Sequence, residues 1–223
     1  MTDFARLMSD YFVKYLAGQK GSGSNTMKTY RDTFVQLLEF MDEKKHIRAD
    51  CIEVDSFSYD IINEFLEYLE KEKRVSISTR NNRLAAIRSF FKYTGYHEPK
   101  YLNISTSIRE ISKKKTEGRQ MNYLSVNAME HFLNSFDKTD HKELRCFCIV
   151  LLLYESGARV TELCNVRRYD LHLEKPYTMI LHGKGDKIRS VPLDGLVADV
   201  ISNYIQKYRV DDNDFLFFNT RRA

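Results

Sequence analysis

Residues 151–163 read LLLYESGARVTEL, an apolar run that ends in glycine and is followed almost at once by an arginine. The pattern predicts an apolar helix that stops at Gly157, with Arg159 at the start of a new helical turn. A guanidinium buried in this position needs a partner, and Glu162, three residues further on, lies on the same helix face. Taken alone, the two residues fit a structural ion pair as well as a functional site.

A second motif follows, in which two short apolar segments, residues 177–182 and 188–193, flank the sequence GKGDK at residues 183–187. Alternating apolar residues around a glycine-rich turn predict a β-hairpin. Lys184 lies between two glycines, which remove side-chain bulk and let its ammonium approach a ligand. The motif is not a nucleotide-binding P-loop, which needs GxxxxGK[ST] before a helix. In isolation, Lys184 also fits a solvated lysine at a hairpin tip.

The chain before these motifs predicts a compact bundle of four amphipathic helices, because apolar residues recur there at helical spacing. The four stretches are residues 4–16, 25–41, 58–71 and 78–93. Further helices are predicted near residues 125–136 and 196–205, and a strand at residues 215–218. The apolar pattern thins between residues 105 and 120, which indicates a linker. We therefore expect a first domain at residues 1–108, a basic linker at 109–121 and a second, mixed domain at 122–223.

Composition excludes several classes of protein. The 223 residues are 43% hydrophobic and include only nine glycines and three prolines, which excludes disordered and collagen-like chains. No apolar stretch is long enough for a membrane span and no signal peptide is visible, so we expect a cytoplasmic protein. The four cysteines, at positions 51, 146, 148 and 164, form no CxxC pair and are expected to be reduced core thiols.

Charge is distributed unevenly along the chain. Residues 42–72 hold ten acidic and four basic residues, whereas residues 74–119 hold eleven basic and three acidic ones. This contrast predicts a surface that faces a polyanion, backed by a solvated acidic face. A basic stretch that is merely solvated remains the alternative.

Candidate DNA contacts follow from this distribution. Hydroxyls and cations in the first turns of the second helix favour phosphate, and four cations decorate the fourth helix. Arg83 and Arg88 point about 140° apart on a helix, so the four cannot all read one groove, and we expect Arg80 and Arg83 on the groove side. The linker cations can lie along a phosphate backbone or stay extended in water. The full set is Thr26, Lys28, Arg31, Arg80, Arg83, Arg88, Lys92, Lys113, Lys114, Lys115, Arg119 and Lys187.

Together, GARVTEL at residues 157–163 and GKGDKIRSVPL at residues 183–193 resemble the first catalytic boxes of the tyrosine recombinases, the phage integrase and Xer-type family. The resemblance covers essentially the whole chain. It implies a mostly α fold: a four-helix, SAM-like core-binding domain, then part of a mixed α+β catalytic domain with a small antiparallel sheet. By this resemblance, Arg159 matches the first catalytic arginine, Glu162 the acid that supports it, and Lys184 the β-hairpin lysine.

The resemblance also implies a reaction, phosphoryl transfer on DNA without metal or nucleotide cofactor. A tyrosine hydroxyl attacks the scissile phosphate, which gives a 3′-phosphotyrosyl link and a free 5′-hydroxyl. A planar guanidinium can grip the non-bridging oxygens, on which charge develops in the transition state. Lys184 would protonate the departing 5′-oxygen as a general acid.

The family's remaining boxes, His-x-x-Arg, a later His or Trp and the nucleophilic tyrosine, are not found in these residues. None of the fourteen tyrosines is assigned as nucleophile, and the chain resembles the front two-thirds of a recombinase. We therefore expect it to bind double-stranded DNA without cleaving it, and to be a monomer off DNA. Other protomers would join it on DNA in the full-length protein.

Two alternatives stay open at this point. A non-catalytic DNA-binding regulator or architectural protein with the same fold predicts the same salt-sensitive DNA binding. A helical protein-interaction module is disfavoured by the paired motifs, but it would explain the acidic stretch at residues 42–72.

Overall fold

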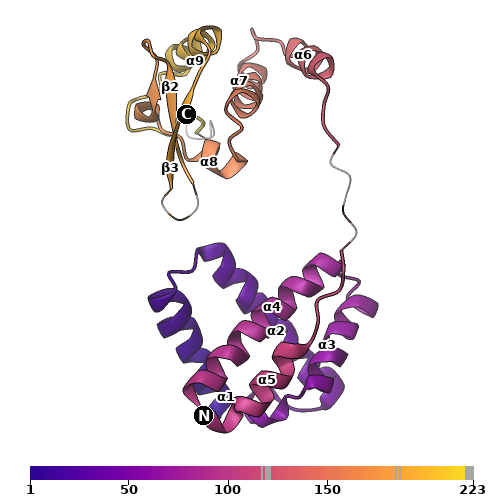
Figure 1. Cartoon of the computed structure of the whole chain (residues 1–223). Helices are drawn as coiled ribbons and strands as arrows, with labels where there is room; N and C mark the ends of the chain where they lie inside the picture. The colour runs from indigo at the N-terminus through magenta and orange to yellow at the C-terminus, as the bar shows by residue number, and fades with distance from the viewer. Residues whose placement is uncertain (117, 119–121, 184, 186, 219–223) are drawn as a thin grey trace. The chain divides into compact units, whose positions relative to one another are not determined.

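The computed structural model describes residues 1–116, 118, 122–183, 185 and 187–218. The chain divides into two compact units, residues 1–120 and 121–223, which we call the N-terminal and C-terminal units (Figure 1). Each unit has its own hydrophobic core. The predicted fold class, mostly helical with one small antiparallel sheet, is confirmed.

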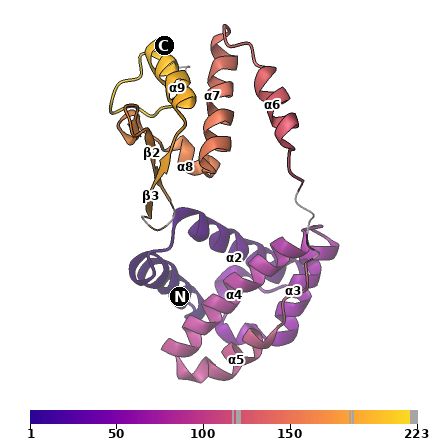
Figure 2. The ribbon, with the colours of Figure 1, turned by 45° about the horizontal axis from the view of Figure 1, so that its top comes forward.

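The N-terminal unit has helices joined by short loops, and its described residues include no strand. Helix α4 packs against α2, α3 and α5, and Figures 1 and 2 show this arrangement from two directions. The helices are α1 (Asp3–Asp10), its π-helical continuation η1 (Tyr11–Gln19), α2 (Ser24–Lys45), α3 (Tyr59–Lys71), α4 (Ile77–His97) and α5 (Leu102–Glu110). Three short 3-10 turns connect them: η2 (Ala49–Cys51), η3 (Val54–Ser56) and η4 (Pro99–Tyr101).

The core of this unit is built around aromatic rings. Phe90 lies at its centre, with its ring centroid 5.3 Å from Phe34, 5.4 Å from Tyr11 and 5.5 Å from Phe4, each in an edge-on arrangement. Such pairs add about 0.5–1.5 kcal/mol each beyond the area that they bury. The predicted apolar stripes therefore meet in one place, which holds α1, η1, α2 and α4 together.

Helix α5 was not predicted from the sequence. It has few apolar residues, but Ile108 is buried and the Ser105 hydroxyl donates a hydrogen bond of 2.6 Å to the carbonyl of Phe91. Gly95 allows this close approach, because a Cβ built there would lie 2.7 Å from the Cβ of Ser105. Tertiary packing, not local pattern, forms this helix. The range 109–121, expected as linker, therefore begins inside a helix.

The C-terminal unit packs helices against one small sheet. The helices are α6 (Val126–Asn134), α7 (His141–Ser156), α8 (Val160–Cys164) and α9 (Gly195–Tyr208), with a 3-10 turn η5 (Arg168–Asp170). The strands are β1 (Leu171–His172), β2 (Thr178–His182) and β3 (Ile188–Pro192), antiparallel in the order β1-β2-β3. Met179 pairs with Val191 and Leu181 pairs with Arg189, so the predicted hairpin is confirmed.

One sequence prediction about this unit was wrong, and one short strand was missed. Residues 215–218 form no strand; Phe215 makes only an isolated bridge to Arg167, while the Leu216 amide donates a hydrogen bond of 2.8 Å to the carbonyl of Val166. Burial of Leu216 explains the apolar pattern there without a sheet partner. Strand β1, with two residues, was too short to predict.

The cysteines also differ from the expectation of four core thiols. Only Cys148 is buried, and its burial raises the pKa of the thiol to about 12, whereas the other three are exposed. Cys146 and Cys148 differ because residues two apart on a helix point to nearly opposite faces. Across the described residues, no helix is both long and apolar enough to cross a membrane.

Candidate active site and nucleic-acid interface

A sharp turn between α7 and α8 places Arg159. Gly157 ends α7 with a φ of 58°, in the left-handed region that favours glycine, and its amide donates a hydrogen bond of 3.1 Å to the carbonyl of Leu153. Two residues later Arg159 is extended and serves as the N-cap of α8. The local sequence therefore fixes where the arginine backbone lies, as predicted.

The side chains of Arg159 and Glu162 form the predicted pair. Arg159 Nη1 lies 2.7 Å from Glu162 Oε1, and the Arg159 amide donates a hydrogen bond of 2.9 Å to Glu162 Oε2. The expectation of a buried guanidinium was wrong, because the Arg159 side chain is 74% exposed and that of Glu162 only 4%. The carboxylate folds back onto the start of α8, as in a capping box, while the guanidinium extends into solvent.

Arg189 on β3 completes this cluster. Its Nη2 lies 2.7 Å from Glu162 Oε2 and its Nη1 lies 3.2 Å from Glu162 Oε1. Hydrogen bonds from Arg189, and then from Arg159, lower the pKa of the Glu162 carboxyl to about 2. The same carboxylate raises the pKa of the Arg189 guanidinium. Glu162 is therefore ionised and shared between two guanidinium groups at neutral pH.

Arg189 lies within the motif at residues 183–193, but the motif alone predicts no role for it. The strand pattern held a signal, since side chains two residues apart share a face of a strand. Arg189, Val191 and Leu193 lie at such positions, and the first two are half-buried while Leu193 is buried. A cation on the inner face of a strand needs an acidic partner, which is Glu162.

The base of the β2–β3 loop packs on Glu162. The Gly183 amide donates a hydrogen bond of 2.7 Å to the carbonyl of Lys187, and a Cβ built at Gly183 would lie 3.2 Å from Glu162 Oε1. A larger residue at this position would therefore press on the Glu162 carboxylate. The Lys187 residue is exposed. Lys184, the predicted general acid, lies outside the described residues.

A second buried carboxylate braces β2. Asp170 is 3% exposed; its Oδ1 lies 3.1 Å from His182 Nε2, and its Oδ2 accepts a hydrogen bond of 2.8 Å from the Arg167 amide. Neither Asp170 nor His182 was predicted from the sequence as a site residue. This contact ties the end of β2, next to Gly183, to η5.

The candidate DNA contacts on α2 lie near the start of that helix. Lys28 and Arg31 are exposed, and the Arg31 side chain is 72% exposed with only a loose pairing, 3.9 Å, to Asp32. Thr26 is half-buried and lines a hollow of about 280 Å³ between α2 and α4. The other lining residues are Asn25, Thr29, Tyr30, Asn82 and Ala85. This end of α2 offers hydroxyls, amides and unneutralised cations on one surface.

The arginines of α4 are used inside the unit. Arg80 is 5% exposed and its Nε lies 2.8 Å from Glu70 Oε1, so its expected place in a DNA groove was wrong. A buried guanidinium paired with a carboxylate of α3 is not free to reach a base or phosphate. Arg83 donates hydrogen bonds of 3.1 Å to the carbonyl of Thr29 and 3.3 Å to the Thr33 hydroxyl, which joins α4 to α2.

Arg88 and the remaining cations differ in whether their side chains contact other protein atoms. Arg88 donates to the carbonyl of Arg109, which joins α4 to α5, whereas Lys92 is exposed. Lys113 and Lys115 are exposed, but Lys114 pairs with Glu70 at 2.8 Å. Arg119 lies outside the described residues.

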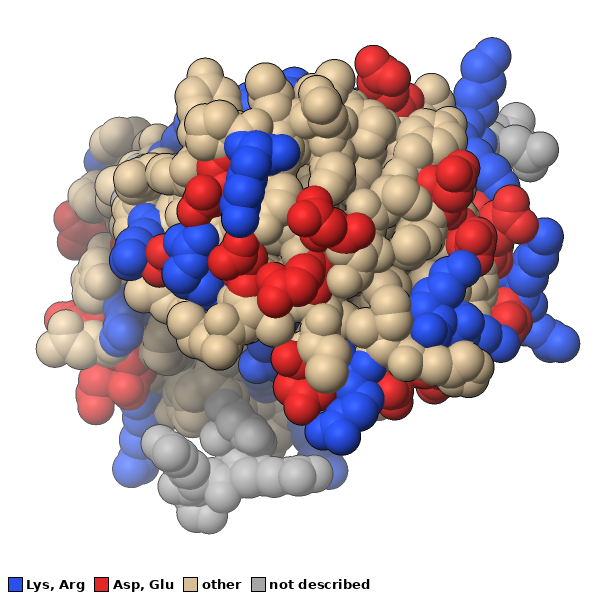
Figure 3. Space-filling view, turned by 90° about the horizontal axis from the view of Figure 1, so that it is seen from below, with Lys and Arg blue, Asp and Glu red and all other residues tan. Residues whose placement is uncertain are grey.

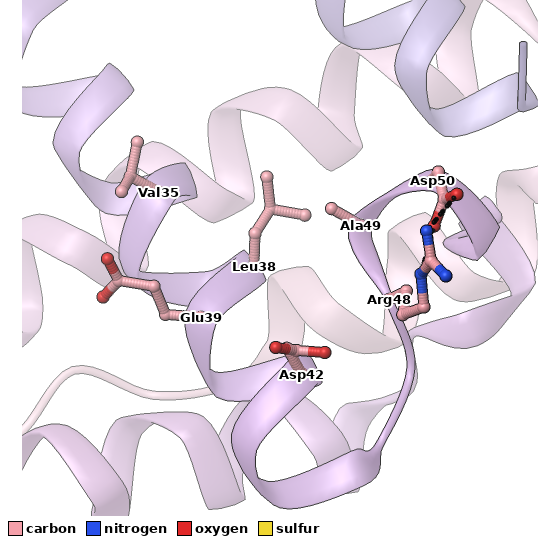
Figure 4. Close-up of a pocket in the computed structure, with 7 residues that line it drawn as sticks. All are labelled: Val35, Leu38, Glu39, Asp42, Arg48, Ala49 and Asp50. Atoms are coloured by element: carbon pink, nitrogen blue, oxygen red, sulfur yellow. Dashed lines mark hydrogen bonds and ion pairs between the residues drawn. The ribbon is translucent and has the colours of Figure 1, made fainter.

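One groove of the N-terminal unit does not suit a polyanion. A groove of about 620 Å³ lies against α2 and η2, where Val35, Leu38 and Ala49 form an apolar floor and the acids Glu39, Asp42 and Asp50 form its rim (Figure 4). Its one cation, Arg48, pairs with Asp50 at 3.0 Å. Figure 3 shows a face on which acidic and basic side chains are mixed among neutral residues, with several acidic side chains near its middle.

Comparison with known proteins agrees with this arrangement. The sequence pattern of the phage integrase family matches residues 122–223, and that of the phage integrase N-terminal SAM-like domain matches residues 10–99. Tyrosine recombinase XerD of Listeria innocua is 30% identical over 224 residues, which cover 94% of this chain and 70% of that protein. The integrase/recombinase y4rC of Sinorhizobium fredii is 27% identical over 217 residues, 97% of this chain and 65% of that protein.

Solved structures share the fold. XerH site-specific recombinase, bound to palindromic difH substrate in a post-cleavage complex, superposes with a TM-score of 0.68 at 22% identity, over 96% of this chain and 62% of XerH. The Tn1549 transposon integrase in complex with transposon right end DNA has the same TM-score at 19% identity, over 99% of this chain and 72% of the integrase.

The two units, one SAM-like and helical and one with an exposed arginine beside a β-hairpin, define the class of protein as an integrase-type one. The chain belongs to the phage integrase family of tyrosine recombinases. It spans less than two thirds of the length of the Sinorhizobium relative and of XerH.

Proposed function

We propose that this chain supplies the DNA-binding unit and the first catalytic residues of a site-specific recombinase. In the proposed reaction a tyrosine cleaves and rejoins double-stranded DNA through a 3′-phosphotyrosyl intermediate. The observation that carries the proposal is the exposed guanidinium of Arg159, held by the buried carboxylate of Glu162. Recombinases among its relatives, XerD for example, support this substrate class.

The chemistry proposed for Arg159 follows from its geometry. One nitrogen of the guanidinium, Nη1, is committed to Glu162, and the rest of this 74% exposed group faces solvent. Preorganised donors of this kind contribute about 10²–10³-fold by stabilising charge that develops in a transition state. Lys184 is proposed as the general acid for the departing 5′-oxygen, a role that contributes about 10²–10⁴-fold. No metal or nucleotide cofactor is part of the proposal.

We assign DNA contact mainly to exposed cations. Lys28 and Arg31 on α2, Lys92 on α4 and Lys113 and Lys115 after α5 have the exposure that a phosphate contact needs. Thr26 contributes a hydroxyl beside the α2–α4 hollow, and Lys187 a cation next to the loop. Arg83, Arg88 and Lys114 contact protein atoms, so we propose that they shape the surface.

In domain terms, the DNA clamp is proposed for residues 1–108 and the catalytic part for residues 122–223. Binding of duplex DNA by the 223-residue chain tests the first assignment, with fluorescence anisotropy over a series of salt concentrations. Affinity should fall steeply with salt, because each neutralised phosphate releases counterions. A binding constant that does not change with salt, or no binding at low salt, would contradict the proposal.

Cleavage is tested separately with a nicked suicide substrate. We propose that the 223-residue chain is a monomer off DNA, and that it binds DNA without forming a covalent adduct because His-x-x-Arg is not found among its residues. A protein–DNA adduct on a denaturing gel would contradict the proposal that the chain does not cleave DNA. A dimer detected by light scattering would contradict the proposal that the chain is a monomer. A non-catalytic regulator predicts the same results, so sequencing the gene beyond position 223 separates the two: a downstream His-x-x-Arg and tyrosine indicate a recombinase.

A further inference from the structure

We propose that Arg189 is a positioning residue, which holds Glu162 so that the guanidinium of Arg159 stays fixed, and which fastens β3 to α8 beside the β2–β3 loop. The use of Arg159 on a phosphate rests on the proposed function. The contacts themselves need no DNA, and the test below is independent of DNA binding.

The two arginines divide their nitrogen atoms differently. Arg189 directs both terminal nitrogens to Glu162, one to each oxygen, at 3.2 Å and 2.7 Å. Arg159 directs only Nη1 to the same carboxylate, and no hydrogen bond from its Nη2 or Nε is found among the described residues. Arg189 therefore commits both of its terminal nitrogens to Glu162, whereas Arg159 commits one and keeps Nη2 and Nε for a ligand. This division distinguishes a positioning residue from a ligand-binding one.

Without Arg189, Glu162 would lose a fork-to-carboxylate contact. The planar guanidinium matches the two oxygens and fixes the carboxylate in rotation as well as in position. The remaining partners would both come from Arg159, through its Nη1 and its amide. A side chain that is 74% exposed has little other packing, so its guanidinium depends on this carboxylate for its place.

The cluster also reaches the β2–β3 loop. Arg189 pairs in register with Leu181, two residues before Gly183. A Cβ built at Gly183 would lie 3.2 Å from Glu162 Oε1 and 3.8 Å from Arg189 Nη1. The base of the loop, β3 and α8 thus meet at the Glu162 carboxylate. A substitution at Arg189 should therefore affect both α8 and the β2–β3 loop.

The test compares Arg189→Met, Arg189→Lys and the matched control Arg168→Met in the 223-residue chain. Arg168 is also a half-buried arginine of the C-terminal unit, but it donates to the carbonyl of Leu171 and not to Glu162. The first readout is ¹⁵N relaxation of the Arg159 Nε–H group, and the second is the pH titration of the Glu162 carboxyl by ¹³C NMR. Thermal unfolding of each variant is recorded in parallel.

In Arg189→Met, Arg159 Nε–H should lose order and Glu162 should bind protons at least about tenfold more tightly, because one of two neighbouring cations is gone. Arg189→Lys should give intermediate values, since an ammonium cannot bridge both oxygens with a planar fork. Arg168→Met should match the parent protein in both readouts.

An Arg159 side chain that stays as ordered in Arg189→Met as in the parent would overturn the proposal, even if the protein is less stable. If Arg189→Met does not fold, Arg189→Lys decides by the same comparison, and parent-like order in that variant contradicts the assignment. A third measurement follows the Arg159 Nε signal as inorganic phosphate is added. The two Arg189 variants should bind phosphate more weakly than the parent protein. Failure to bind duplex DNA, by contrast, would contradict the proposed function and leave these readouts intact.

Discussion

Arg80 on α4 and Glu70 on α3 form an ion pair inside the N-terminal unit, with Arg80 Nε 2.8 Å from Glu70 Oε1. Glu70 Oε2 also lies 2.8 Å from Lys114 Nζ, after α5. One carboxylate therefore joins three parts of the unit. Glu162 does the same in the C-terminal unit, where it joins Arg159 and Arg189. In both places, an arginine that the sequence pattern suggests as a DNA-contacting residue is paired with a carboxylate. The carboxylate of Glu162 is buried, and that of Glu70 is partly buried.

Because Arg80 is paired inside the N-terminal unit, we predict that its substitution lowers the stability of that unit and not its affinity for DNA. Arg80→Met should lower the free energy of unfolding of the N-terminal unit by about 3 kcal/mol, because it leaves the Glu70 carboxylate with fewer partners. Urea unfolding followed by circular dichroism measures it. Lys113→Met, at an exposed position in the basic stretch, is the control and should change stability by less than about 0.5 kcal/mol. Unchanged stability together with weaker DNA binding in Arg80→Met would instead support a contact between Arg80 and a DNA groove.

For the exposed cations of α2 we predict the opposite pattern: their substitution weakens DNA binding and leaves stability nearly unchanged. Lys28→Ala and Arg31→Ala should each weaken DNA binding at all sequences and reduce the salt slope of log K by about 1, since each removes one phosphate contact. Stability should change little. Lys71→Ala is the control, because Lys71 is as exposed but pairs with Glu67 at 2.7 Å on α3. Equal losses in all three variants would show a general charge effect and not a surface on α2.

The contact between α4 and α5 predicts a steric effect. Gly95→Ala should destabilise the N-terminal unit by about 1–3 kcal/mol, because the new methyl group would lie 2.7 Å from the Cβ of Ser105. Chemical denaturation of the parent and the variant measures this difference. Gly18→Ala is the control, since a Cβ there meets only an ordinary contact of 3.6 Å. A stabilised Gly95→Ala protein would show that α5 shifts away without cost.

The Glu162 cluster predicts a pH dependence. The folded pKa of Glu162, about 2, lies below its ordinary value of 4.5, so its contribution to stability is full above pH 4.5 and is lost as the pH falls toward 2. Glu162→Gln should be less stable than the parent at neutral pH, and the difference should shrink over that window. Thermal unfolding of both proteins at several pH values measures it. A difference that stays constant down to pH 2 would contradict an ionised Glu162.

Much of the fold could be predicted because it is encoded locally. The spacing of Phe34, Leu37 and Met41 predicts α2, and Gly157 predicts the end of α7, because helix periodicity and the left-handed glycine need only neighbouring residues. Helix α5 lacks such a pattern and depends on Gly95 in another helix. The segment at residues 215–218 has the apolar pattern of a strand but lacks a strand to pair with beyond one bridge.

The amino-acid sequence by itself determined most of the helical elements, the hairpin and the pairing of Arg159 with Glu162, since the residues that define each of them lie within a few positions of each other. Only the tertiary structure decided which charges are free and which are committed. Arg80 finds its acid ten residues away on another helix, and Arg189 finds Glu162 across a strand–helix contact. The reason is physical: the charge of a side chain is set by its chemistry, but its exposure and its partners are set by elements that meet only when the chain folds.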